Sequence, residues 1–156
     1  MLNITKQKLN ILLIVLCIFL MPGCSNKAMK SIDPVEFEQI VTKTKNSKLI
    51  ILDIYHDRCE SCKQIEPVME ELKNDLSENP NISFLKYDLS NPLTIYKSRK
   101  IAKELDLENL YKAQRYSGVV LFIDNNSKQV IDTLIAEYDI TRYRKVIEER
   151  FKNLNS

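Results

Sequence analysis

The sequence contains few of the residues that build metal centres or disulfide scaffolds. Its 156 residues include one histidine, four cysteines and no tryptophan. Cys17 and Cys24 lie in or directly after a hydrophobic N-terminal leader, so one cysteine pair is left for the folded domain. One pair is too few for a disulfide-stabilised fold. A zinc ion needs about four ligands, whereas Cys59, Cys62 and His56 supply three only if their loop folds back, and Asp57 would be a poor fourth. A zinc site within one chain is therefore disfavoured, and a cluster shared between two copies stays open.

The chain also lacks an excess of charge. Its formal net charge is +2, and because Lys6 and Lys8 lie in the leader, the remainder has 21 basic and 21 acidic residues. A domain of balanced charge has no electrostatic basis for binding nucleic acid. We see no internal repeat or low-complexity stretch, and the length left after the leader suits one domain.

The N-terminus reads as a leader. A short basic start is followed by an apolar run, Leu9–Met21, thirteen residues broken only by Asn10. This length is typical of a signal peptide and is short for a membrane span. The end of the leader, Leu20-Met21-Pro22-Gly23-Cys24, resembles a bacterial lipobox, in which a small residue precedes the cysteine that receives diacylglycerol.

The leader therefore predicts where the protein resides. We expect residues 1–23 to be a lipoprotein signal peptide, Cys24 the lipidation site, 24–31 a tether and 32–156 the folded domain. The domain would then be extracytoplasmic, anchored by lipid to a bacterial membrane in the periplasm or at the cell surface. Simple secretion and an uncleaved anchor remain the alternatives, and both also place the domain outside the cytoplasm.

The rest of the chain is organised around Cys59-Glu60-Ser61-Cys62, which follows the apolar run Leu49–Tyr55 and opens a predicted helix. At a helix N-terminus, unpaired N–H groups and the positive end of the helix dipole stabilise a thiolate. The thiolate is the form that attacks disulfides, so Cys59 is the better nucleophile of the pair.

The residues around this motif make it more specific. Asp53 lies six positions before Cys59, and Pro67 lies eight positions after it. The pattern Asp-(x)5-Cys-x-x-Cys-Lys-x-Ile-x-Pro resembles the thioredoxin active site. The resemblance implies that Cys59 and Cys62 form a redox disulfide, that Asp53 shuttles a proton for Cys62, and that no cofactor is needed. The alternative is a set of structural residues: a strand-end aspartate, a stapling disulfide and a helix-ending proline.

Hydrophobic patterning predicts an α/β fold. The order of elements is that of a thioredoxin-like fold, with a central mixed sheet of about four strands flanked by helices. The segment 93–116 is longer than its counterpart in that family, and a packing insertion is favoured over a cap on the active site. The expected helices are 34–45, 59–76, one or two within 93–116, and 139–154, and the expected strands are 49–55, 82–87, 119–123 and 129–136.

Two positions depart from the family. Ser117, Gly118 and Val119 align with the family's substrate groove, but Gly118 stands where thioredoxins carry a cis-proline. A cis bond without proline costs roughly 2.5–4 kcal/mol, so we expect a trans bond and an altered groove. Lys86 lies near the position of a lysine that neighbours the buried aspartate in the family. The position of Lys86 along the strand differs by about one residue from that of the family's lysine, which favours an ordinary surface lysine.

Two functions follow from these observations. The first is a thiol–disulfide oxidoreductase that exchanges electrons with client proteins bearing disulfides or thiols. Glu60 between the cysteines also resembles membrane-anchored thioredoxins that reduce apocytochrome c, which favours a reductase recharged by a membrane electron donor. The second is a non-enzymatic binding module of the cell envelope that holds a partner protein or a metal, and Gly118 favours it.

Overall fold

The structure is a computed structural model and describes residues 32–154. The predicted signal peptide, the lipidation site Cys24 and the tether lie outside the described residues. Among the helices that the structure describes, none has the length and apolar character needed to cross a membrane. The elements are α2 Pro34–Asn46, β1 Leu49–Tyr55, α3 Glu60–Asp75, β2 Ile82–Asp88, α4 Pro92–Glu104, α5 Glu108–Ala113, β3 Val119–Asp124, β4 Val130–Ile135 and α6 Ile140–Leu154.

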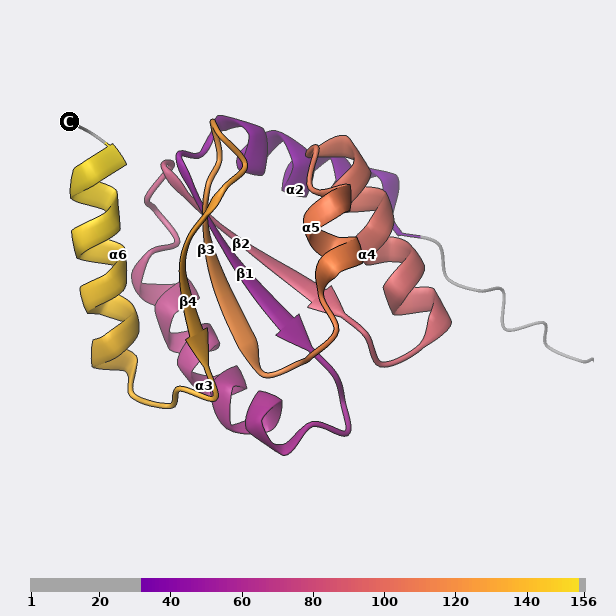
Figure 1. The fold of residues 1–156 in the computed structure, drawn as a ribbon. Helices are drawn as coiled ribbons and strands as arrows, with labels where there is room; N and C mark the ends of the chain where they lie inside the picture. Colours follow the sequence, from indigo (N-terminus) through magenta and orange to yellow (C-terminus); the bar gives the residue numbers. More distant parts are fainter. Residues whose placement is uncertain (1–31, 155–156) are drawn as a thin grey trace, which may run out of the picture. The chain divides into compact units, whose positions relative to one another are not determined.

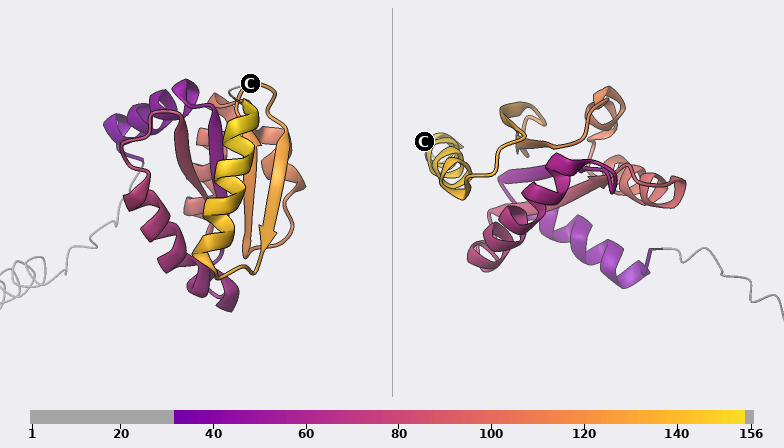
Figure 2. Two further views of the ribbon diagram at one scale, coloured as in Figure 1. Left: turned by 90° about the vertical axis from the view of Figure 1, so that its left-hand side faces the viewer. Right: turned by 90° about the horizontal axis from the view of Figure 1, so that it is seen from below.

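The four strands form one mixed sheet in the order β2-β1-β3-β4. Strand β1 pairs in parallel with β2 and antiparallel with β3, and β3 pairs antiparallel with β4. This arrangement confirms the predicted α/β fold with a four-stranded mixed sheet flanked by helices. Figures 1 and 2 show α2, α4 and α5 over one face of the sheet and α3 with α6 over the other.

Strand β1 runs through the middle of the sheet, and its side chains alternate between two apolar clusters. Ile50, Leu52 and Ile54 face α2, α4 and α5, whereas Leu49 and Ile51 face α3 and α6. Because both faces are covered, the strand is almost continuously apolar. Asp53 belongs to the second series by this alternation, so its side chain points toward the helix that carries the cysteines.

The helix starts follow local capping chemistry. The Asp33 side chain accepts a hydrogen bond from the Val35 N–H at 2.9 Å, with Pro34 in the first turn, as predicted. Helix α4 begins with a capping box between Asn91 and Thr94. Such caps satisfy backbone donors that a helix leaves unpaired at its N-terminus.

The long segment before β3 differs in part from expectation. It forms two helices, as considered, but α5 ends at Ala113, so the predicted helical character of 114–116 is wrong. The two helices are separated where Asp106 adopts a φ of 57°. Leu105, Leu107 and Tyr111 are buried in the cluster beneath α4 and α5. This segment therefore packs against the sheet, as the favoured interpretation of a packing insertion proposed.

Candidate active site

Cys59 is the N-cap of α3, after a short loop that follows β1. Its Sγ accepts a hydrogen bond from the Cys62 N–H at 3.2 Å. Burial opposes ionisation of this thiol, but hydrogen bonds from the Cys62 and Ser117 side chains and from the N–H groups of Ser61 and Cys62 outweigh it and lower the pKa of Cys59. A lowered pKa is what a nucleophilic cysteine requires at neutral pH.

Cys62 lies one helical turn deeper and is buried. Its thiol lies 3.8 Å from the carbonyl oxygen of Ile54, to which it donates. Burial raises the pKa of Cys62, and its hydrogen bond to Cys59 raises it further. Both cysteines are free thiols in the structure. The two pKa values therefore move apart, which divides the pair into a partly exposed attacking thiol and a buried thiol that keeps its proton.

Asp53 is buried on the same face of β1 as α3, with 4% of its surface exposed. Its Oδ1 has no hydrogen-bond partner among the described residues. Burial raises the pKa of this carboxyl from 3.8 to about 6, although Lys86 and Lys73 act in the opposite direction. A carboxyl that titrates near neutral pH suits a group that accepts and returns a proton.

Lys86 corrects the sequence interpretation. Strand β2 pairs with β1 in a register that places Lys86 directly opposite Asp53, so the expected one-residue offset is wrong. The Lys86 Nζ contacts Glu66 Oε1 at 2.9 Å and lies 3.4 Å from the centre of the Tyr55 ring. Burial opposes its charge, but Glu66 and Asp53 raise the pKa of Lys86. It is a partly buried ammonium group on the residue paired with the buried Asp53.

The predicted groove residues lie against the cysteines. Gly118 has a φ of 76°, and none of the peptide bonds in the described part of the chain is cis. A side chain at this position would have its Cβ 3.1 Å from Ser61 Cβ and 3.4 Å from Cys59 Sγ. Glycine is therefore favoured here both by its conformation and by the close approach of Ser61. The Gly118 N–H donates to Ile54 O at 2.8 Å, and Gly118 O accepts from the Ala136 N–H at 2.9 Å.

Sequence reasoning missed a tyrosine beside the motif. The hydroxyl of Tyr138, in the β4–α6 loop, donates to Ser61 Oγ at 3.1 Å, 77 residues away in sequence. Tyr138 is 43% exposed, Ile135 is 71% exposed and Tyr116 is 79% exposed. Ile135 pairs with Val119 in the sheet, and Tyr116 directly precedes Ser117. We call these three side chains the apolar rim. Tyr138 contacts Ser61 between the two cysteines, Tyr116 lies two residues before Gly118, and Ile135 pairs with the residue after Gly118.

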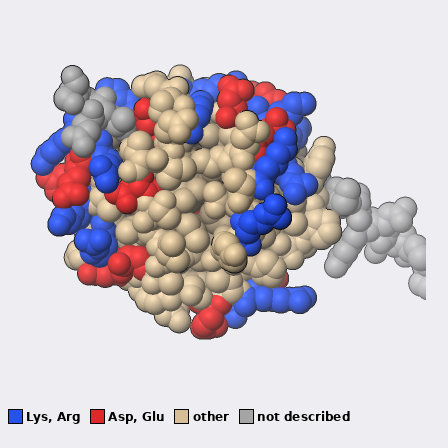
Figure 3. Space-filling model, viewed as in Figure 1, with Lys and Arg blue, Asp and Glu red and all other residues tan. Residues whose placement is uncertain are grey.

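The surface over β3 and β4 is weakly charged. In the view of Figure 3, the central area is uncharged, and lysine, arginine, aspartate and glutamate side chains surround it. Large apolar side chains exposed on β4 include Val130 and Ile135. Ile135, one residue of the apolar rim, lies on β4 itself.

His56 does not join the cysteines in a metal site. Its Nδ1 accepts the Arg58 N–H at 3.0 Å, so this ring nitrogen is engaged within its own loop. Within residues 32–154, no group of three or more histidine, cysteine, aspartate or glutamate side chains is arranged to hold a metal ion. The described residues therefore give the metal-binding alternative no ligand set within one chain.

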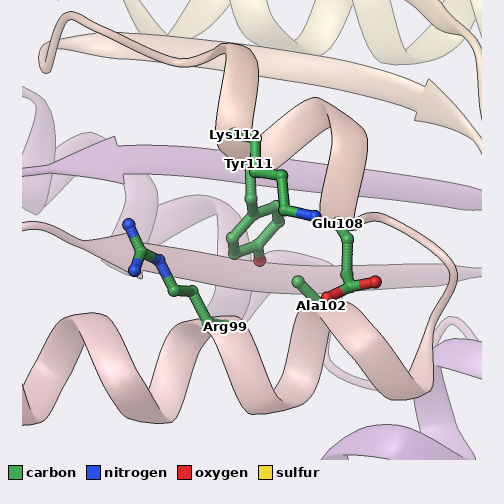
Figure 4. A pocket seen from close by; sticks show the side chains of 5 residues that line it. All are labelled: Arg99, Ala102, Glu108, Tyr111 and Lys112. Atoms are coloured by element: carbon green, nitrogen blue, oxygen red, sulfur yellow. The ribbon is translucent and has the colours of Figure 1, made fainter.

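A separate cavity lies between α4 and α5. It measures about 180 Å³ and is lined by Arg99, Ala102, Glu108, Tyr111 and Lys112. Figure 4 shows these side chains coming only from the two helices. None of them contacts the cysteine pair, so the cavity is not part of the candidate site.

Comparison with known proteins agrees with this geometry. Residues 28–104 match the thioredoxin family. The matched range contains the strand β1 with Asp53, the cysteine pair and Pro67 within α3. Together with the Cys59–Cys62 pair, the thioredoxin match supports a thiol–disulfide oxidoreductase in general terms. Ser117, Gly118 and Tyr138 lie beyond the matched range.

Solved structures with similar folds include three thioredoxin-related proteins. Trxlp of Edwardsiella tarda EIB202 is 15% identical, with a TM-score of 0.46 over 74% of this chain and 94% of that one. Fasciola hepatica thioredoxin is 20% identical, with a TM-score of 0.44 over 74% and 91%. Malassezia sympodialis thioredoxin is 24% identical, with a TM-score of 0.44 over 75% and 87%. A comparison with curated proteins found no match.

Proposed function

We propose that this protein is a lipid-anchored, extracytoplasmic thiol–disulfide oxidoreductase that reduces disulfides in client proteins. The observation that carries the proposal is the opposite shift of the two thiols. The pKa of Cys59 is lowered by hydrogen bonds at the start of α3, whereas burial raises the pKa of Cys62 one turn later. The buried carboxyl of Asp53 lies on the face of β1 that this helix covers.

This arrangement supports a two-step exchange. The Cys59 thiolate attacks a client disulfide, so that a Cys59–client S–S bond forms while the client S–S bond breaks and one client sulfur leaves as a thiolate that takes a proton. The Cys62 thiol then gives its proton to Asp53 and attacks Cys59 Sγ. The Cys59–Cys62 disulfide forms, the second client thiolate leaves, and the client has gained two electrons.

The groove suits an extended client segment. Among the described residues, the Ser117 N–H and C=O make no hydrogen bond to other backbone groups, so both are available to pair with a client backbone. Both backbone groups of Gly118 are engaged within the fold. The apolar rim of Tyr116, Ile135 and Tyr138 offers apolar contact beside the pairing site. We infer that clients are bound as extended segments with apolar side chains near the disulfide.

A reductase outside the cytoplasm needs a source of electrons. We propose that a membrane-bound donor reduces the Cys59–Cys62 disulfide after each turnover, since extracytoplasmic compartments are oxidising. The lipid anchor predicted at Cys24 would keep the domain near such a donor. The location and the anchor are supported by the leader sequence.

The direct test is the reduction of insulin by dithiothreitol. We expect residues 25–156 to accelerate it, because both apolar clusters lie within this part of the chain and give it its own core. Cys59→Ser should abolish the acceleration, and Cys62→Ser should trap a mixed disulfide with the client. An unaccelerated reaction that is identical for parent and Cys59→Ser would refute the proposal.

The redox potential then decides the direction. A potential near that of thioredoxin, roughly −270 mV, is expected for a reductase, and a value near −120 mV would make the protein an oxidant. Potentials are measured by equilibration in thiol buffers and mass counting of alkylated cysteines.

A binding module remains the second candidate, and Gly118 is the observation that favours it. Gly118 stands where the family has a cis-proline. It has a φ of 76°, and both its backbone groups are used in hydrogen bonds to Ile54 and Ala136. Such a module would capture its partner without the cysteines. Partner binding that survives replacement of Cys59 and Cys62 by serine, together with a pair that never titrates, would favour this candidate.

A further inference from the structure

The lysine opposite the buried Asp53 carboxyl is paired with a different carboxylate. Lys86 lies directly opposite Asp53 in the β1–β2 register, which is the position from which a lysine can reach it. Its Nζ instead contacts Glu66 at 2.9 Å and lies over the Tyr55 ring. Asp53 Oδ1 has no hydrogen-bond partner among the described residues. The nearest ammonium group is thus used by another carboxylate.

Glu66 lies on α3, the helix that also carries Cys62. It lies four residues after Cys62 on α3, so the two side chains share one side of the helix. Pro67 follows Glu66 within α3. The neighbouring Ile65 and Met69 are buried against the sheet, and their packing fixes this part of the helix. Glu66 can therefore contact Lys86 from the element that also carries the buried thiol.

The charges that act on Asp53 come from each element packed against it. Lys86 and Lys73 favour its ionised form, whereas Glu66 and Asp88 disfavour it, and burial is the largest effect. From α6, the Tyr143 ring is buried in the same cluster, but its hydroxyl donates to the Glu137 carbonyl at 2.8 Å. Of the two lysines, Lys86 has the larger effect on Asp53, and it lies opposite Asp53 in the β1–β2 register.

We propose that Glu66 is a positioning residue that holds Lys86 away from Asp53, so that the Asp53 carboxylate stays able to take up a proton at neutral pH. The inference rests on the proposed function, in which the proton comes from Cys62. The S–H bond of Cys62 breaks, the proton moves to Asp53, and the electron pair left on sulfur forms the bond to Cys59. A carboxylate paired directly with an ammonium group is a weaker base for this step.

The position of the proton on Asp53 can be measured directly. The ¹³C chemical shift of its carboxyl carbon is followed from pH 4 to 9 in the oxidised protein, in which neither thiol titrates. In Glu66→Gln, Lys86 is free to approach Asp53, and the midpoint should fall by about one pH unit or more. In Lys86→Gln the midpoint should rise. Glu70→Gln is the matched control, because Glu70 is an exposed carboxylate on the same helix, one turn later.

The double variant Glu66→Gln/Lys86→Gln distinguishes an effect of Glu66 through Lys86 from a direct effect of its own charge on Asp53. If Glu66 works by holding Lys86, its replacement should have a much smaller effect in the Lys86→Gln protein than in the parent. An equal shift in both backgrounds would mean that Glu66 acts on Asp53 only by its own charge. That result, or an unchanged midpoint in Glu66→Gln, would overturn the positioning role.

The rate of insulin reduction provides an independent measurement. Its pH profile should shift to lower pH in Glu66→Gln and to higher pH in Lys86→Gln, a change that a purely structural role would not cause. Inactivity of the parent would reject the proposed function, while the carboxyl titration would still decide the role of Glu66. An active parent with an unshifted titration would reject the positioning role alone.

Discussion

Replacing Asp53 by asparagine should stabilise the protein, and the gain should depend on pH. The pKa of this carboxyl is raised by burial from 3.8 to about 6, which corresponds to a free energy of about 3 kcal/mol between the two protonation states. The amide keeps the shape of the side chain but cannot ionise. The variant therefore lacks the cost of burying a charge.

The sign follows from proton binding. Below pH 3.8 the carboxyl is protonated in both the folded and the unfolded chain, and ionisation contributes nothing to the difference between parent and variant. As the pH rises through 6, the folded protein releases the proton from Asp53, and the stability that this proton contributed to the parent is lost. Above pH 7 the variant should gain up to about 3 kcal/mol in the free energy of unfolding, relative to the difference at low pH.

Urea unfolding of the oxidised protein at several pH values measures this effect. With a slope of about 1–3 kcal/mol per molar urea, the midpoint of Asp53→Asn relative to the parent should increase by roughly 1–3 M between pH 4 and pH 8. Glu70→Gln, which removes an exposed carboxylate from α3, should show no such trend. A difference between Asp53→Asn and parent that is the same at every pH would refute the account of Asp53 as a buried, destabilised carboxylate.

Three further changes test other parts of the site. Gly118→Ala should lower the free energy of unfolding by at least about 1–2 kcal/mol in urea unfolding, because of its φ of 76° and a Cβ contact of 3.1 Å with Ser61; an unchanged midpoint would contradict this. Tyr138→Phe and Ser61→Ala remove the same hydrogen bond, so each should cost about 0.5–1 kcal/mol and the double variant less than the sum, whereas additive losses would show that the bond contributes nothing. Cys24→Ala should abolish the incorporation of a labelled fatty acid into the full-length protein in bacterial cells, and unchanged incorporation would count against lipidation of Cys24.

Much of the fold was predictable because its signals are local. The run 49–55, apolar except for Asp53, is typical of a strand covered on both faces, and the structure gives the strand those bounds. Asp33 and Pro34 predicted the start of α2, because a side-chain cap and a fixed φ act within a few residues. Cys59 was likewise predicted at the start of α3, where it is now the N-cap.

The errors came from contacts between distant segments. The position of Lys86 depends on the register of β2 against β1, which is set by burial along both strands, and spacing along the chain does not reveal it. Tyr138 contacts Ser61, from which it is separated by 77 residues in the sequence, and no local sequence pattern predicts this contact. Glu66 reads in the sequence as one of many helical carboxylates, and its role requires knowing that Lys86 lies beside it.

Gly118, which the sequence resemblance aligns with a proline, connects several parts of the groove through its backbone. A proline ring would shape the groove by its own bulk, whereas Gly118 supplies two backbone hydrogen bonds, one to Ile54 on β1 and one from Ala136 after β4. Ile54 also accepts the hydrogen bond of the Cys62 thiol. One short stretch of backbone therefore connects the buried cysteine, the groove and the loop that presents Tyr138. Because this connection uses hydrogen bonds rather than a side chain, Gly118→Pro should not restore a family-like groove. It would remove the N–H that Ile54 accepts and impose a φ near −65° where the chain has 76°.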